Sequence, residues 1–307
     1  MTEEYTLTQK AVAEFIGTFS IVFFGAGAVA IDLMTVPEGA LGEGAAAMFT
    51  VDGLGLGTLG WVGIALAFFG AVAIPIYLLG HVSGQHINPA VTVAFWLTDR
   101  IETTPAAVYI GAQLAGGIAA GLVFVAIRGT EAVTVGGMGA TIAFPGIAGW
   151  QAALNELVIT FFLMVTIMAM AIDERTPDEF AGLTIGFIVA VGVLATGNIN
   201  GASFNPARTV GPYVLNTLVA GDLAIWAEIW IYVLGPTVGA ILGAYFYDSM
   251  VLDPIAEEQP PDEPEGGRAG YREDATESEA ESNGGRDGTG SEGGRAGRSE
   301  GDGSVEN

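Results

Sequence analysis

The sequence predicts an all-α membrane protein, with six transmembrane helices and two re-entrant half-helices in an inverted repeat. Three observations predict this fold class: an apolar composition, apolar runs of two distinct lengths, and an internal repeat. Of the 307 residues, 51% are hydrophobic and 14% are charged, and the mean hydropathy is +0.51. Because soluble domains carry about a quarter charged residues, this composition argues against a soluble protein.

Six apolar runs are long enough to cross a bilayer. Crossing roughly 30 Å of hydrocarbon as a helix takes about 17 to 25 residues. The first run is too long for the core of a cleaved signal peptide and follows an acidic segment, so we expect it to be retained as a span. The six predicted spans are residues 11–34, 59–80, 105–127, 150–172, 180–197 and 225–246.

Two further apolar runs, residues 88–97 and 205–215, have only half that length. As helices they would each reach roughly 15 Å, so that together they would span one membrane. Each run opens with Asn-Pro, which favours a helix start because Asn is a good N-cap and Pro fits the first helical position. Two ordinary interfacial helices would start in the same way. The sequence around the Asn-Pro pairs decides between that interpretation and two half-helices that span the membrane together.

The contexts of the two Asn-Pro pairs repeat each other. The segment GHVSGQHINPAVTV, which begins at Gly80, shares seven identities with GNINGASFNPARTV, which begins at Gly197, at a constant offset of 117. Glu14 and Glu156 likewise occupy matching places in the first and fourth spans. Each copy holds three spans and a half-span, and this odd number of crossings requires the second copy to insert upside down.

Inverted repeats bring the two half-helices together near the middle of the membrane. We predict irregular backbone before each of them, at residues 81–87 and 199–204. Irregular backbone is tolerated at that depth only where it lines a polar cavity or is buried in protein. The predicted geometry therefore favours a pore or a binding site. We place the two repeats at about residues 8–128 and 149–249.

The chain divides into a transmembrane channel domain, residues 1–250, and an acidic tail, residues 251–307. The tail contains sixteen Asp or Glu and five Arg, with almost no large apolar side chain. Such a segment cannot bury enough surface to offset its ordering entropy, so we expect it to be disordered.

The net charge of −24, with Lys10 as the single lysine, argues against nucleic acid or anionic lipid headgroups as partners. An extreme halophile is one source that fits this charge, although the tail alone explains nearly half of the acidic excess. The chain has no cysteine and two histidines, so we expect no disulfide, no metal site and no cofactor.

The predicted meeting point has a distinct electrostatic character. Two helix N-termini present about half a positive charge each, together with the amide donors of Asn88 and Asn205. Cations are repelled there, and a water that accepts from both amides would donate only outward and could not relay a proton. Arg208 is the only basic residue within any apolar run. A buried guanidinium is costly enough to indicate function, whereas a snorkelling side chain would lie at a helix end rather than one turn inside.

These residues together resemble an aquaporin of the major intrinsic protein family, and especially its archaeal branch. The resemblance covers residues 8–249 and implies six tilted helices and two half-helices per monomer, four monomers per assembly and one pore in each monomer. It implies passage of water and small neutral solutes, but not of ions or protons. The signature consists of two Asn-Pro-Ala boxes, the Arg that follows the second box, and the paired glutamates: Asn88, Pro89, Ala90, Asn205, Pro206, Ala207, Arg208, Glu14 and Glu156.

The resemblance also implies a narrow selectivity filter, which spacing from the boxes places at Phe68, Val193, Ala202 and Arg208. Val193 stands where water-specific members have histidine, so we expect a wider and more apolar filter. Strongly glycerol-selective members have Asp after the Arg and a second aromatic in the filter, whereas this chain has Thr209 and Ala202. We therefore expect water conduction with some glycerol, and the alternative is a glycerol facilitator with water secondary.

Four buried or flanking titratable residues have two interpretations each. Glu14 and Glu156 could relay protons, but their repeat-related placement favours a structural role, as acceptors for backbone N–H groups of the re-entrant loops. His81 and His86 flank the first box and could gate a pore near neutral pH. A loop histidine with satisfied hydrogen bonds is the interpretation we favour.

Rival classes fit less well. A secondary transporter also uses inverted repeats and broken helices, but coupling needs ionisable groups at the midplane, where only the paired glutamates and Arg208 are candidates. A cation channel needs carbonyl or carboxylate rings, which Arg208 opposes. We expect no enzyme, because no nucleophile, base and orienting group occur together.

The orientation of the chain is weakly marked. Lys10, Arg100 and Arg175 are predicted on one side of the membrane, and Arg128 on the other. We expect a multi-pass protein of the cell membrane. The positive-inside rule then places both termini and the acidic tail in the cytoplasm.

Overall fold

Six long apolar helical segments form a bundle in the computed structural model, which describes residues 5–35 and 59–252. Each segment has between 23 and 29 residues, enough to cross a bilayer. The prediction of six spans is confirmed, and the chain is a multi-pass membrane protein. The segments are Leu7–Met34, Gly60–Ser83, Thr103–Arg128, Gly149–Ile172, Asp178–Asn200 and Ala224–Leu252.

Several spans change helix type along their length. The first consists of α1 (Leu7–Ser20), a π-helical segment η1 (Ile21–Ala26) and α2 (Gly27–Met34). The others are α3 (Gly60–Ser83), α5 (Thr103–Arg128), α7 (Gly149–Ile167) with η4 (Met168–Ile172), η5 (Asp178–Phe180) with α8 (Ala181–Asn200), and η7 (Ala224–Glu228) with α10 (Ile229–Tyr247) and η8 (Asp248–Leu252). The last helix therefore continues two residues into the segment predicted as tail, and the rest of that prediction falls outside the described residues.

The two predicted half-helices are α4 (Pro89–Leu97) and α9 (Pro206–Leu215), and η6 (Asn216–Ala220) follows α9. Asn88 and Asn205 cap them from extended backbone, with φ of −156° and −148°. The Oδ1 atom of each Asn accepts a hydrogen bond of 2.9 Å from the backbone N–H two residues on. The helix starts predicted from the Asn-Pro pairs are thus confirmed.

The helices that precede the boxes end later than the sequence predicted. The expectation of irregular backbone from residues 81 and 199 was wrong, because α3 runs to Ser83 and α8 to Asn200. Each ends at a glycine in the left-handed region, Gly84 with φ of 82° and Gly201 with φ of 87°. The helices stop where a residue without Cβ can adopt this conformation at little cost.

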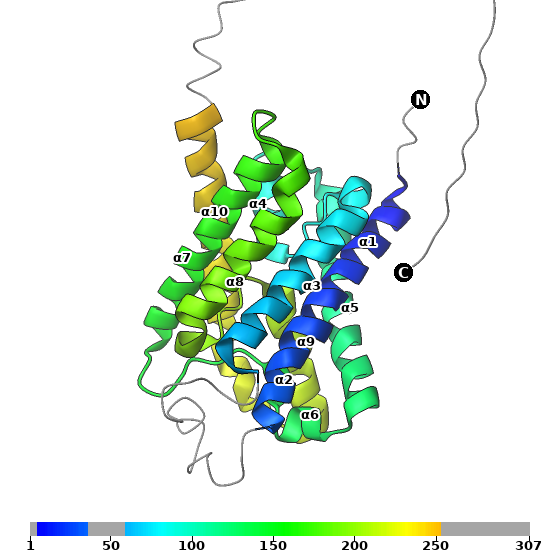
Figure 1. Ribbon diagram of the computed structural model, residues 1–307, viewed down its shortest axis with the longest axis vertical. Coiled ribbons are helices and arrows are strands. Elements are labelled where there is room, and N and C mark those ends of the chain that lie inside the picture. Colours follow the sequence, from blue (N-terminus) through cyan, green and yellow to red (C-terminus); the bar gives the residue numbers. More distant parts are fainter. Residues whose placement is uncertain (1–4, 36–58, 253–307) are drawn as a thin grey trace, which may run out of the picture. The chain divides into compact units, whose positions relative to one another are not determined.

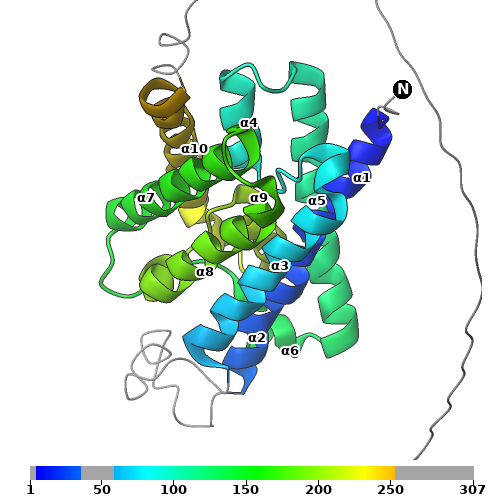
Figure 2. The same ribbon diagram turned by 45° about the horizontal axis from the view of Figure 1, so that its top comes forward.

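Close backbone contacts hold equivalent helix pairs together. In Figure 1, α3 lies beside α1 and α8, and Figure 2 shows α10 alongside α7. A Cβ on Gly116 of α5 would lie 2.4 Å from the Phe15 carbonyl oxygen of α1, and one on Gly239 of α10 would lie 2.2 Å from that of Leu157 of α7. Only glycine allows these backbones to touch, as in other membrane helix pairs.

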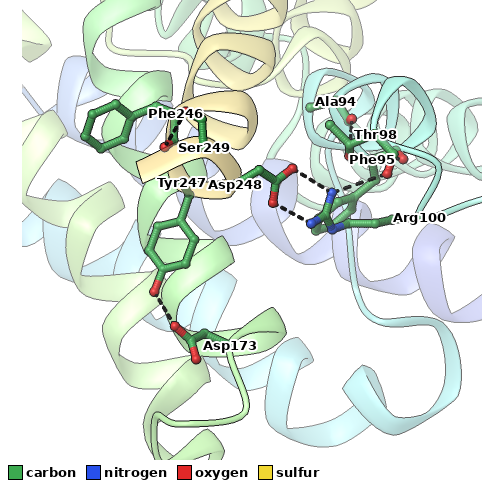
Figure 3. A network of polar contacts seen from close by, with 9 residues as sticks. All are labelled: Ala94, Phe95, Thr98, Arg100, Asp173, Phe246, Tyr247, Asp248 and Ser249. Atoms are coloured by element: carbon green, nitrogen blue, oxygen red, sulfur yellow. Dashed lines mark hydrogen bonds and ion pairs between the residues drawn. The ribbon is translucent and has the colours of Figure 1, made fainter. Parts of the chain in front are cut away.

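The end of the last span is tied to two loops (Figure 3). Asp248 accepts from both terminal nitrogens of Arg100, at 3.0 and 2.6 Å, in the turn after α4. The Tyr247 hydroxyl donates to Asp173 at 2.8 Å, and Arg175 forms an ion pair with the same carboxylate. The Arg175 guanidinium holds the pKa of Asp173 well below its usual range.

Candidate functional site

The two half-helices meet at their N-termini, and each holds the loop that leads into the other. The Nδ2 atom of Asn88 donates to the Phe204 carbonyl oxygen at 2.8 Å, and that of Asn205 donates to Ile87 at 2.7 Å. Since the Oδ1 atoms already accept from the starts of their own helices, the orientation of each amide is defined. Each NH₂ group carries a second hydrogen that remains for another acceptor.

The loops at this junction adopt the same unusual backbone. Gln85 and Ile87 have φ of 47° and 44°, and their repeat equivalents Ala202 and Phe204 have φ of 43° and 60°. Residues with a side chain rarely adopt left-handed backbone, and β-branched residues such as Ile87 do so least. Strain of this kind persists where surrounding contacts impose it, which is common at functional sites.

Glu14 supplies contacts of this kind to the first loop. Its side chain is fully buried and accepts from the backbone N–H groups of His86 at 2.9 Å and of Ile87 at 2.6 Å. The Ser83 hydroxyl donates to it at 2.7 Å and the Gln113 amide at 2.8 Å. Four donors therefore converge on one carboxylate, which anchors the loop to α1.

Glu156 does the same for the second loop from α7. It is fully buried and accepts from the backbone N–H groups of Ser203 at 2.7 Å and Phe204 at 2.8 Å. The Asn200 amide donates to it at 2.9 Å, from the position equivalent to Ser83. This geometry favours the structural interpretation of both glutamates over a proton relay.

A cavity of about 170 Å³, here called the box cavity, lies against the junction. Its polar wall includes Asn88, Asn205 and His86, and Phe68 borders it. Gln85 and Ser203 add two more polar residues, and most of the remaining wall consists of apolar side chains, chiefly of α3, α4, α7 and α8. The two Asn amides are therefore placed at the edge of a space with few competing polar groups.

The two histidines occupy different surroundings. His86 packs between the rings of Phe95 and Tyr109, at 4.8 and 5.2 Å between centroids, and its Nδ1 atom lies 3.2 Å from the Thr92 hydroxyl. His81 is exposed in the last turn of α3. The contacts of His86 favour a hydrogen-bonded loop histidine over a pH gate.

A second cavity of about 420 Å³, the arginine cavity, is lined by Arg208, Val193 and Gly201 among others. Phe68 borders this cavity as well as the box cavity, so its ring lies where the two approach each other. Gly25 of the π-helical segment η1 makes room for that ring, since a Cβ there would lie 2.4 Å from it.

The Arg208 guanidinium lies over the Phe68 ring, with its Cζ atom 5.2 Å from the ring centroid. The side chain is 2% exposed, and its Nη1 atom donates to the Gly139 carbonyl oxygen at 2.8 Å. Within the described residues, its buried Nε–H has no hydrogen-bond partner. The Arg208 cation thus borders the cavity, while that Nε–H is enclosed by the protein.

The predicted filter positions come together only in part. Phe68, Val193 and Arg208 line the arginine cavity. Ala202 is buried and is not among the residues that line either described cavity, whereas its neighbour Gly201 is. The filter role of all four residues stays a prediction.

Sequence reasoning missed several groups of the site. Tyr109 and Tyr232 donate from α5 and α10 to the carbonyl oxygens of Ser83 and Asn200, each at 2.9 Å. They lie 123 residues apart, in the third span of each repeat, and this matching placement was a signal that could have revealed them. The Gly139 carbonyl, which holds Arg208, lies in a segment without helical periodicity and left no such signal.

The fold and this junction define a class of protein: a multi-pass membrane bundle with two re-entrant half-helices that meet at a polar centre. A family model described as major intrinsic protein matches residues 1–247. The chain therefore belongs to the major intrinsic protein family, as its resemblance to aquaporins predicted. This is a family of channels rather than enzymes.

Several known proteins are similar to the chain. Aquaporin AqpM of Methanothermobacter thermautotrophicus is 51% identical over 250 residues, which cover 81% of this chain and 99% of that protein. A probable aquaporin AqpM of Archaeoglobus fulgidus is 46% identical over 249 residues, with 81% and 99% covered. The X-ray structure of the aquaglyceroporin from Plasmodium falciparum has a TM-score of 0.68 at 23% identity, covers 82% of this chain and 99% of that one, and supports the fold.

Proposed function

We propose that this protein is a passive channel that conducts water, passes some glycerol and other small neutral solutes, and excludes ions and protons. The observation that carries the proposal is the reciprocal bond between the boxes, Asn88 to Phe204 and Asn205 to Ile87. It directs two helix N-termini and two amide groups toward one point beside the box cavity.

Exclusion of cations follows from the charges at this point. Each helix N-terminus carries about half a positive charge, and Arg208 adds a full one beside the neighbouring cavity. A water molecule that accepts from the remaining hydrogens of Asn88 and Asn205 has its own hydrogens directed away from the junction. A chain of waters oriented in this way cannot relay a proton through it.

The expected solute range follows from Val193. This side chain is 1% exposed, lines the arginine cavity together with Phe68 and Arg208, and offers no hydrogen-bond donor. Arg208 can still donate to a hydroxyl or to water, while an apolar wall accommodates the carbon side of glycerol. The same observation supports the alternative, a glycerol facilitator with water secondary.

A secondary transporter is disfavoured by the placement of the carboxylates. Glu14 and Glu156 are fully buried, accept four and three hydrogen bonds respectively, and are not among the residues that line the two described cavities. An ion coupled at the midplane would have to reach one of them. Asp222 and Glu228 do line the arginine cavity, but they lie just before and at the beginning of the last span rather than at its middle.

Assembly and orientation are part of the proposal. Membership in the family supports four monomers, each with its own pore, in a cell membrane. The distribution of Lys10, Arg100, Arg175 and Arg128 supports cytoplasmic termini and a cytoplasmic tail. We keep residues 1–250 as the channel domain and residues 251–307 as the acidic tail.

The function is tested with the full chain reconstituted in liposomes, by stopped-flow light scattering at several glycerol concentrations. We expect glycerol flux that rises linearly with concentration, because a channel has no step that saturates like an alternating-access cycle. Saturation in the millimolar range would identify a transporter. Swelling no faster than in empty liposomes, for both water and glycerol, would overturn the proposal.

A further inference from the structure

The carbonyl group that holds Arg208 belongs to a strained turn, η3 (Gly137–Gly139). Three consecutive residues have left-handed backbone, with φ of 54° at Gly137, 51° at Met138 and 64° at Gly139. A Cβ on Gly139 would lie 2.2 Å from the Ala26 carbonyl oxygen, so the turn is pressed against η1. The two glycines adopt this backbone at little cost, but it is unfavourable for Met138, so contacts from outside the turn help to hold it.

One face of the half-helix α9 and of η6, which continues it, supplies these contacts. Thr209, Tyr213 and Asn216 are spaced by four and three residues and therefore share a face. Asn216 donates through Nδ2 to the Gly137 carbonyl oxygen at 2.8 Å, at one end of the turn. At the other end, Tyr213 donates to the Thr141 carbonyl at 2.8 Å, and the hydroxyls of Thr141 and Thr209 lie 2.9 Å apart.

These bonds close a ring that returns to the same half-helix. Tyr213 of α9 and Asn216, the first residue of η6, hold the turn, and the Gly139 carbonyl of the turn accepts from Arg208, which is also on α9. Asn216 also lines the arginine cavity, whereas Tyr213 is fully buried and is not among the residues that line the two described cavities, so the Tyr213 hydroxyl acts through the turn alone.

We propose that Asn216 and Tyr213 are positioning residues that fix the Arg208 guanidinium against Phe68 and thereby determine how sharply the channel discriminates between water and glycerol. The inference rests on the proposed function, in which Arg208 borders the conducting path. A guanidinium whose carbonyl partner is free to move samples more positions. Discrimination by size then weakens, and glycerol permeability rises relative to water permeability.

The test uses Tyr213→Phe and Asn216→Ala in the full chain, with water and glycerol permeability measured on the same liposomes. Tyr213→Phe removes one hydrogen bond and leaves both cavity walls intact, so we expect the ratio of glycerol to water permeability to rise about two- to tenfold. Asn216→Ala removes its bond to the turn and also widens the wall of the arginine cavity, so its ratio should rise at least as much. Tyr245→Phe is the matched control, because its hydroxyl also donates to a backbone carbonyl, that of Leu97 at 3.0 Å, remote from the turn. Its ratio should equal that of the wild type.

A second background separates positioning from general loosening of the fold. In Arg208→Val protein, Tyr213→Phe should leave the permeability ratio unchanged, because there is no guanidinium left to position. A change of the same size in both backgrounds would overturn the inference, and so would a wild-type ratio in the Tyr213→Phe protein that retains Arg208.

Two further results complete the test. Thr141→Val, which keeps the side-chain shape and removes one hydroxyl, replaces Asn216→Ala if that variant does not elute as a single species in detergent. Wild-type liposomes that pass neither water nor glycerol would overturn the proposed function and this inference together. Normal wild-type flux with an unaltered ratio in the variants overturns this inference alone.

Discussion

The side-chain nitrogen of Asn88 lies 2.8 Å from the carbonyl oxygen of Phe204, so the N-cap of one half-helix binds the loop that precedes the other half-helix. The reciprocal bond from Asn205 to Ile87 measures 2.7 Å. Neither half-helix can shift along its axis without breaking a bond to the opposite loop. The two halves of the chain therefore position each other.

Replacement of Asn88 by Ala should destabilise both the half-helix α4 and the loop that precedes α9. It removes the N-cap of α4 and leaves the Phe204 carbonyl without its amide donor. Loss of the cap costs about 0.5–2 kcal/mol and loss of a buried hydrogen-bond partner about 1–3 kcal/mol. We expect a lower unfolding temperature and lower water permeability, with a comparable loss for Asn205→Ala. Wild-type values of both quantities would show that the reciprocal bonds do not position the boxes.

Glu156→Gln tests whether this buried side chain supports a loop or relays protons. The amide can keep one acceptor oxygen, but its NH₂ group would face a backbone N–H of Ser203 or Phe204. An unsatisfied buried donor costs about 1–3 kcal/mol, so thermal unfolding in detergent should occur at lower temperature. Water flux through the remaining folded protein should not depend on pH between 5 and 8. Wild-type stability combined with altered proton flux would favour the relay instead.

Val193→His should shift the solute range toward water. The imidazole is larger than the isopropyl group and adds a hydrogen-bonding nitrogen to the wall of the arginine cavity. Glycerol permeability should fall by about tenfold or more, while water permeability falls by less, because added bulk excludes the larger solute first. Val191→Thr on the same helix is a control, since Val191 is exposed and lines neither described cavity. An unchanged glycerol-to-water ratio would remove Val193 from the filter.

Asp173→Asn should lower stability at neutral pH and have less effect in acid. Arg175 lowers the pKa of Asp173 in the folded protein, so its ionised form stabilises the fold above the unfolded pKa of about 3.9. That stabilisation is lost as pH falls below this value toward the lower folded pKa. The difference in unfolding temperature between wild type and variant should be constant from pH 7 to 5 and should shrink below about pH 4.

The control for this prediction is Glu131→Gln, which removes an exposed ion pair with Arg128 at 3.4 Å. Exposed pairs of this kind contribute little, so its unfolding temperature should follow that of the wild type at every pH. A difference for Asp173→Asn that stays constant down to pH 3 would contradict the assigned contribution of the ion pair.

The spans and helix starts could be predicted because their signals are local. Run length gave the six spans, and Asn-Pro gave the starts of α4 and α9. The ends of α3 and α8 were misplaced by a few residues, because their endings depend on the left-handed Gly84 and Gly201. Many other glycines in this chain serve close packing and look the same in the sequence.

The surroundings of Arg208 could be predicted only in part. Spacing from the boxes identified Phe68 and Val193 as filter candidates, and both line the arginine cavity. The turn at Gly139, and its support by Asn216 and Tyr213, is formed by contacts between residues about seventy positions apart. No periodic pattern in a single sequence encodes such contacts, whereas the paired glutamates were visible because the repeat presents them twice.

The proposed pore conducts water and blocks protons. The most direct test measures osmotic water permeability and proton leak together, in liposomes that contain the full chain and a pH-sensitive dye. We predict water efflux well above that of empty liposomes, with a proton leak equal to theirs. Water efflux at the level of empty liposomes, or a proton leak that rises with the amount of protein, would contradict the account.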